Sequence, residues 1–347
     1  MKISEILVIP KHVLGFLDWF SGLLFINEPF PRWQKIASSE GFASAGPRGR
    51  LLAQTVTHET YHFLQITTCG YLYVFASRLF VEMGRIILRD GPLEAERLER
   101  LAKNPPAPSE AVIALFGEID RPGPAGVSVR AIVESAAYLY ELRTHLVDLD
   151  DDGFQEILRR DPLPIEYRLA YDVLREACGA AAFANLLPLC LVALCFARPE
   201  AVYPELIAEA VARGLHYRGQ ADLRSFLQLA MDLQPRYPVL GTAGEVAAQW
   251  SAQKKQQHPI YFPGIAALNE LAERISPLLL MVEPGVLSLD HARALVQPIR
   301  LNDGYVILPP VFEERYGASA EDQALSISIM AAVAHGILNY KEERVPS

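Results

Sequence analysis

The chain has 347 residues, of which 51% are hydrophobic and 21% charged, and its formal net charge is −9 at pH 7. This length and composition predict a soluble globular protein with one large or two ordinary domains. The negative charge and the lack of basic clusters interleaved with aromatic residues argue against a nucleic-acid partner.

The first 50 residues contain an apolar run from Val13 to Ile26, which Asp18 and Trp19 interrupt. No small-residue cleavage site follows this run, so we interpret it as an amphipathic or core segment rather than a signal peptide. We find no convincing run of strands before residue 58. The cysteines lack C-x-x-C spacing and lie in apolar surroundings, which is typical of buried free thiols in a reducing compartment and predicts a cytoplasmic location. They are Cys69, Cys178, Cys190 and Cys195.

Apolar residues at helical spacing predict one long helix from Arg50 to Arg89, or two helices if Gly70 breaks it. A second firm helix is predicted from Ser128 to Val147. A mainly α, multi-helix fold with few short strands follows from these patterns. The later elements are predicted helices over 165–178, 180–197, 204–214, 221–233, 242–257, 264–276 and 320–340, and a strand over 304–308.

The segment from Ala180 to Ala197 has no charged residue over about 18 positions, the lower limit for a membrane-spanning helix. Asn185 and Pro188 lie within this segment, and Arg198 follows it directly. We therefore predict a buried core helix here and no membrane span.

Residues 58–62 read His-Glu-Thr-Tyr-His, an uninterrupted H-E-x-x-H inside the first long predicted helix. Positions i and i+4 of a helix share one face, so His58 and His62 can offer two imidazoles to one metal ion. Glu59 lies on an adjacent part of that side, where it can accept a proton from water activated by zinc without being a ligand.

A catalytic zinc site needs a third protein ligand, and the extended motif with a third downstream histidine is absent here. The predicted helix from Ser128 to Val147 carries Glu134, Glu141 and His145, which their spacing of seven and four residues places on one stripe. A buried carboxylate is costly unless it is paired or bound to metal. Glu134 is the preferred third ligand and Glu141 the alternative, while pairing of the stripe with arginines is the competing explanation.

The pair of segments His58-Glu-Thr-Tyr-His62 and Glu134-Ser-Ala-Ala-Tyr138 resembles the gluzincin group of zincin metallopeptidases. The resemblance covers two helices, and it implies that His58, His62 and Glu134 bind zinc. It also implies that Glu59 is the general base.

By the same resemblance, Tyr138 or His145 would stabilise the oxyanion, and the substrate would be a peptide or protein. Such enzymes have a β-sheet whose edge strand holds the substrate, and we do not predict one upstream of the motif. We predict a zincin-like metal-binding region over 1–150 and a helical region over 151–347, with a possible boundary near 234–241.

Two other classes of protein fit some of these residues. Glu59-x-x-His62 is also the E-x-x-H of helical di-iron carboxylate oxidoreductases, in which Glu134, Glu141 and His145 would complete a two-iron cluster. Such bundles repeat E-x-x-H, whereas the second pair here is separated by one residue more. The remaining alternative is a non-enzymatic helical interaction protein with a vestigial motif. Metal analysis separates the three classes, because they predict one zinc, two irons or no metal.

Overall fold

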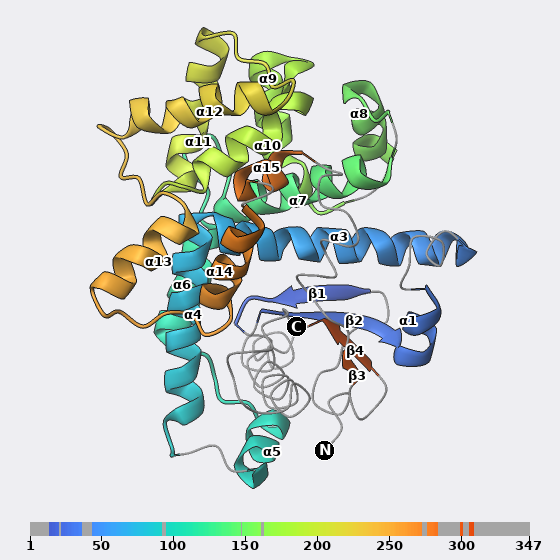
Figure 1. Ribbon diagram of the computed structural model, residues 1–347, viewed down its shortest axis with the longest axis vertical. Coiled ribbons are helices and arrows are strands. Elements are labelled where there is room, and N and C mark those ends of the chain that lie inside the picture. Colours follow the sequence, from blue (N-terminus) through green and yellow to red (C-terminus); the bar gives the residue numbers. More distant parts are fainter. Residues whose placement is uncertain are drawn as a thin grey trace, which may run out of the picture.

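The computed structural model describes residues 14–20, 22–36, 44–91, 95–146, 148–160, 163–272, 276–283, 299–300 and 305–308. Within these ranges the chain is mainly helical, as predicted, and a small sheet lies beside the long helix α3 (Figure 1). The helices are α1 (Phe30–Ile36), α3 (Gly46–Thr68), α4 (Gly70–Leu88), α5 (Ala95–Lys103), α6 (Glu110–Asp120), α7 (Val129–His145), α8 (Asp151–Arg160), the 3₁₀ helix η2 (Ile165–Tyr167), α9 (Leu169–Cys178), α10 (Ala181–Ala193), α11 (Pro199–Ala212), α12 (Gln220–Leu233), α13 (Ala243–Ala252), α14 (Tyr261–Ala272) and α15 (Pro277–Val282).

The sheet has four antiparallel strands in the order β1-β2-β4-β3. They are β1 (Gly15–Asp18), β2 (Leu23–Pro29), β3 (Ile299–Arg300) and β4 (Tyr305–Leu308). In the β1–β2 hairpin Phe16 pairs with Phe25, and the two rings stack. The chain reverses at Gly22, whose φ of 66° is readily available only to glycine and whose N–H donates to Asp18 O at 2.7 Å.

This hairpin corrects one expectation from the sequence. The apolar run is a core segment, as predicted, but the expectation of no convincing strands before the H-E-x-x-H motif is wrong. The strands span only four and seven residues, which is too short for a clear alternating pattern. Asp18 and Trp19, which interrupt the apolar run, mark the end of β1 and the start of the turn. The strand predicted near the C-terminus is confirmed as β4.

The long predicted helix is divided into α3 and α4 at the suggested break. Cys69 has an extended conformation, and Gly70 N–H then donates to Gly241 O at 3.1 Å. A Cβ atom on Gly70 would lie 2.4 Å from that carbonyl oxygen. Glycine is therefore required here because another backbone segment approaches so closely.

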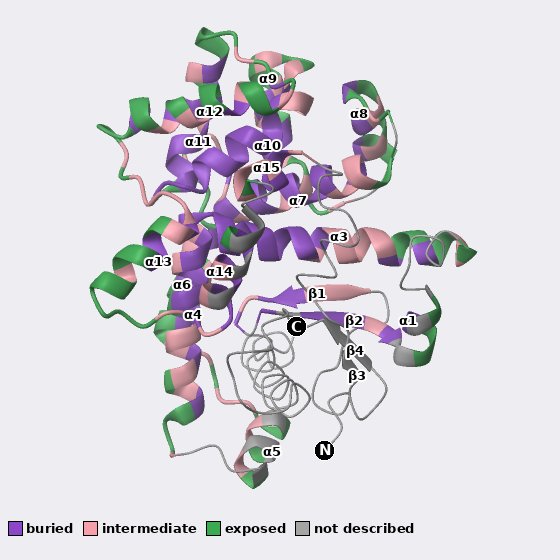
Figure 2. Cartoon of the chain, viewed as in Figure 1, coloured by how far each residue is buried: buried purple, intermediate pink, exposed green. Residues whose placement is uncertain are grey.

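Helices α3 and α7 pack against each other along much of their length. Helix α7 begins at Ser128, whose hydroxyl accepts a hydrogen bond from Ala131 N–H and caps the helix. The N-terminal half of α3 is largely open to solvent, whereas its C-terminal half enters the core (Figure 2). The H-E-x-x-H motif lies where α3 passes from the surface into the core.

Helix α10 lies in the core and packs on α7, α9, α11, α12 and α15, in agreement with the predicted core helix. Among the described residues, no helix is both long and apolar enough to cross a membrane. All four cysteines are free thiols, and Cys178 is the only one of the four that is not fully buried. The helix predicted over 320–340 lies outside the described residues. The division into two regions stays a prediction.

Candidate metal centre

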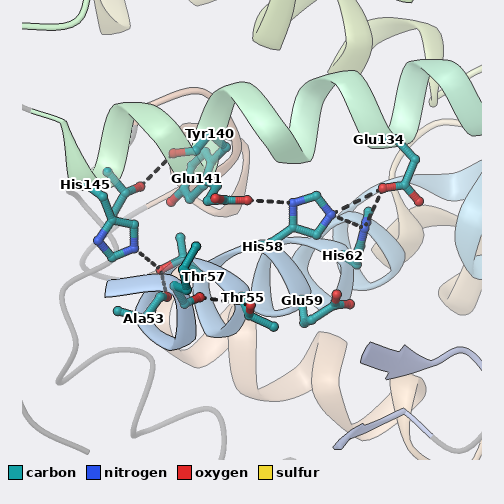
Figure 3. A network of polar contacts seen from close by, with 12 residues as sticks. Ala53, Thr55, Thr57, His58, Glu59, His62, Glu134, Tyr140, Glu141 and His145 are labelled. Carbon is teal, nitrogen blue, oxygen red and sulfur yellow. Dashed lines mark hydrogen bonds and ion pairs between the residues drawn. The ribbon is translucent and has the colours of Figure 1, made fainter. Parts of the chain in front are cut away.

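The candidate centre lies between the antiparallel helices α3 and α7 (Figure 3). Glu134 lies beside His62, whereas His145, at the other end of α7, lies beside Thr57. Because one stripe of α7 faces α3, Glu134, Glu141 and His145 all point towards the motif helix, as their spacing predicted.

His58, His62 and Glu134 bring three ligand atoms together. His58 Nε2 lies 3.1 Å from His62 Nε2 and 3.2 Å from Glu134 Oε2, and His62 Nε2 lies 3.3 Å from the same oxygen. A tetrahedral zinc ion with bonds of about 2.0–2.1 Å places its ligand atoms about 3.3–3.4 Å apart. The triangle is therefore close to the size that one metal ion requires. Within the described residues it is the one group of three potential ligands that meets this kind of spacing.

The second nitrogen of each imidazole has its own acceptor. His58 Nδ1 lies 3.1 Å from Glu141 Oε2, and His62 Nδ1 lies 2.8 Å from Gln65 Oε1. The amide of Gln65 is oriented by its donation from Nε2 to Val133 O at 3.1 Å. These acceptors favour a proton on Nδ1 of both rings, which leaves the Nε2 lone pairs directed at the centre.

The pKa values of His58 and Glu134 are shifted in the directions that favour a positive charge beside a negative one. Burial lowers the pKa of His58, but hydrogen bonds to Glu134 and Glu141 outweigh it and raise that pKa to about 10. Burial raises the pKa of Glu134, but the neighbouring charges and hydrogen bonds of His62 and His58 hold it well below its usual range. A positive charge on His58 is thus favoured beside carboxylates that could also help to hold a metal ion.

Glu59 lies outside this triangle, on the side of α3 that faces the sheet. Its Oε2 accepts a hydrogen bond from the backbone N–H of Leu17 on β1 at 2.8 Å. Burial raises the pKa of Glu59, and the charges of His58 and His62 act in the opposite direction. Glu59 therefore lies next to the candidate ligands and is not a member of the group of three.

Glu141 and His145 differ from Glu134 in what they contact. Glu141 lies on the Nδ1 side of His58 and is not a member of the triangle. His145 is exposed at the end of α7, and its Nε2 lies 2.8 Å from Thr57 Oγ1. Both side chains point towards α3, but neither joins the group of three ligand atoms.

Aromatic residues flank the centre, and two of them were not predicted from the sequence. Tyr167 in η2 stacks on the His58 ring, with ring centroids 5.7 Å apart and an interplanar angle of 25°. The rings of Tyr167 and Tyr138 are nearly perpendicular, with centroids 5.8 Å apart. Burial raises the pKa of Tyr167, and the charges of nearby carboxylates, Glu134 first, raise it further. The ring of Trp19, which follows β1, lies 6.4 Å from the His62 ring. No motif surrounds either residue, so tertiary packing alone reveals them.

Comparison with known proteins gives no further assignment. The chain matches no protein-family model, no curated protein and no solved structure. The function must therefore be argued from the geometry of the centre itself.

Proposed function

We propose that this chain is a zinc-dependent hydrolase with one zinc ion held by His58, His62 and Glu134. The observation that carries the proposal is the triangle of two imidazole nitrogens and one carboxylate oxygen, with edges of 3.1–3.3 Å. Two histidines and one carboxylate form a known ligand set for catalytic zinc, in which a fourth position stays open for water or substrate.

The arrangement favours one ion over two. A di-iron cluster would require Glu59 and Glu141 to face a common space with Glu134. Instead, Glu59 Oε2 is bound by Leu17 N–H, and Glu141 Oε2 faces the far nitrogen of His58. In the proposed centre Glu141 orients His58 and increases its basicity, as outer carboxylates do for metal-bound histidines.

When bound, zinc supplies a Lewis acid that acidifies water and polarises a carbonyl group. Glu59 is the group that accepts the proton. Burial raises its pKa towards neutral pH, which is the range that suits a general base. We assign the stabilisation of the oxyanion to Tyr167 and not to Tyr138 or His145. Its ring lies against His58, whereas Tyr138 contacts Tyr167 and supports it.

The sheet supports a peptide as substrate. Strand β1 is at the edge of the described sheet and packs along α3, beside Glu59. An extended peptide can pair with an exposed strand edge through its main chain. Pairing with Leu17 N–H would replace its hydrogen bond to Glu59 and release the carboxylate for proton transfer. The same substrate class is implied by the resemblance to gluzincins.

The test is the Glu59→Gln variant of the zinc-loaded protein. We expect it to retain one zinc per chain and to lose hydrolysis of a random peptide mixture, read by mass spectrometry of the cleaved products. Glu156→Gln on the exposed part of α8 is the matched control and should behave like the unmodified chain. Hydrolysis that persists in Glu59→Gln would contradict the mechanism. A zinc-loaded protein that cleaves nothing in the mixture would contradict the peptide substrate.

A further inference from the structure

A cavity of about 380 Å³ is lined by residues of α4, of α6 and of the segment that ends and follows α13. Helix α4 contacts both α6 and α13, as the arrangement of these helices in Figure 1 shows. No residue of the candidate metal centre lines it. Its volume falls at the lower end of the range of small-molecule sites, which is about 300–1,000 Å³. We call this cavity the α4/α6 groove.

Small and apolar residues shape the groove. Ala111 and Ala114, one turn apart on α6, are exposed and leave room above Leu115. Trp250 on α13 also lines the groove, and its ring is tilted against that of Tyr73, with the ring centroids 5.8 Å apart. The groove can therefore accept a flat or branched apolar group against these side chains.

The charges that line the groove do not cancel. Arg78 is paired with Glu118 at 2.9 Å, and Glu82 is paired with Arg85. Lys255 is the remaining charged residue that lines the groove, and it makes no ion pair with any described residue. Its ammonium lies over the Trp250 ring, 5.7 Å from the ring centroid. One uncompensated positive charge thus stands beside an aromatic wall.

We propose that the α4/α6 groove binds a small monocarboxylate with an aromatic or branched apolar body. The body packs between Trp250 and the alanines of α6, and the carboxylate pairs with Lys255. A neutral ligand would leave that ammonium unpaired, and a dianion would exceed the single free charge. The site is independent of the proposed hydrolase function, because it shares no residue with the metal centre.

The test compares N-acetylphenylalanine with N-acetylphenylalanine amide by isothermal titration calorimetry on the full chain. We expect the carboxylate to bind at least about tenfold more tightly than the amide, a difference of about 1.4 kcal/mol. Equal affinities, or no saturable binding of the acid up to about 10 mM, would overturn the proposal. This comparison uses the unmodified protein and does not depend on a variant that folds.

Three variants locate the site. Lys255→Gln should lower the affinity for the acid to that for the amide, and Ala114→Phe should fill the groove and abolish binding of both. Lys254→Gln is the matched control, because the neighbouring lysine does not line the groove and should leave both affinities unchanged. Acid binding that survives Ala114→Phe in a folded protein places the ligand elsewhere and overturns the assignment.

Discussion

Glu141→Gln separates a residue that orients a metal ligand from one that binds the metal. Glu141 Oε2 lies 3.1 Å from His58 Nδ1, and its side chain is 12% exposed. Glutamine keeps the volume and an acceptor oxygen but removes the charge that supports the imidazole. Loss of such outer partners typically weakens metal binding by about 10–100-fold, which corresponds to about 1.4–2.7 kcal/mol. We expect the zinc Kd of Glu141→Gln to rise within that range.

The assay is competition for zinc between the purified protein and a chromophoric chelator at constant pH. Glu134→Gln is measured in parallel and should lose far more affinity, because it removes a direct ligand. Glu156→Gln, an exposed carboxylate on α8, should retain the affinity of the unmodified chain. A loss in Glu141→Gln as large as that in Glu134→Gln would show that Glu141 binds the metal. An unchanged Kd would refute the orienting role.

Three further predictions concern catalysis, packing and pH. Tyr167→Phe should retain zinc while kcat falls by about 10²–10³-fold, as for loss of one oxyanion donor, and unchanged kcat would exclude the residue. Gly70→Ala should lower the free energy of unfolding in urea by about 1–3 kcal/mol, because the added Cβ would clash with Gly241 O. Gly84→Ala, whose Cβ would meet open space, should raise it by about 0.5–1 kcal/mol. Similar effects of the two substitutions would refute the close approach at Gly70. His258 is buried, accepts hydrogen bonds from two backbone N–H groups, and has its pKa lowered by burial to about 3. Because the pKa of His258 is lower in the folded state, its contribution to the free energy of unfolding is complete above the unfolded pKa of about 6.5. That contribution is lost as the pH falls towards 3. Between pH 7.5 and pH 5 the free energy of unfolding of the unmodified chain should therefore fall by about 2 kcal/mol more than that of His258→Asn. Equal decreases in the two proteins would contradict a neutral buried histidine.

The parts of the centre that follow from local helix geometry could be predicted from the sequence. The i, i+4 spacing of His58 and His62 fixes their common face wherever the helix lies. The stripe on α7 could also be predicted, because spacings of seven and four residues keep Glu134, Glu141 and His145 on one side of a helix. Sequence spacing could not decide whether Glu134 or Glu141 lies beside Nε2 of His58, with the other beside Nδ1. That choice depends on how α3 and α7 are offset along their axes.

Other parts depend on contacts between distant segments and gave no local signal. Leu17 N–H reaches Glu59 across 42 residues of chain, and this contact exists only because β1 packs on α3. Tyr167 reaches His58 through a short 3₁₀ helix that precedes α9, in a segment where the sequence predicted one continuous helix. Gln65 belongs to no recognisable motif, yet its amide oxygen lies 2.8 Å from His62 Nδ1. Such supporting residues follow from packing and not from periodicity.

X-ray absorption at the zinc edge of the purified, zinc-loaded chain identifies the ligands of the bound metal. We expect one zinc per chain, with nitrogen and oxygen ligands at about 2.0–2.1 Å and the multiple-scattering pattern of two imidazoles. Those ligands are His58, His62 and Glu134, so His62→Ala should reduce the imidazole count and the bound zinc together. A sulfur shell at about 2.3 Å, a single imidazole, or a protein that binds no zinc would contradict the account.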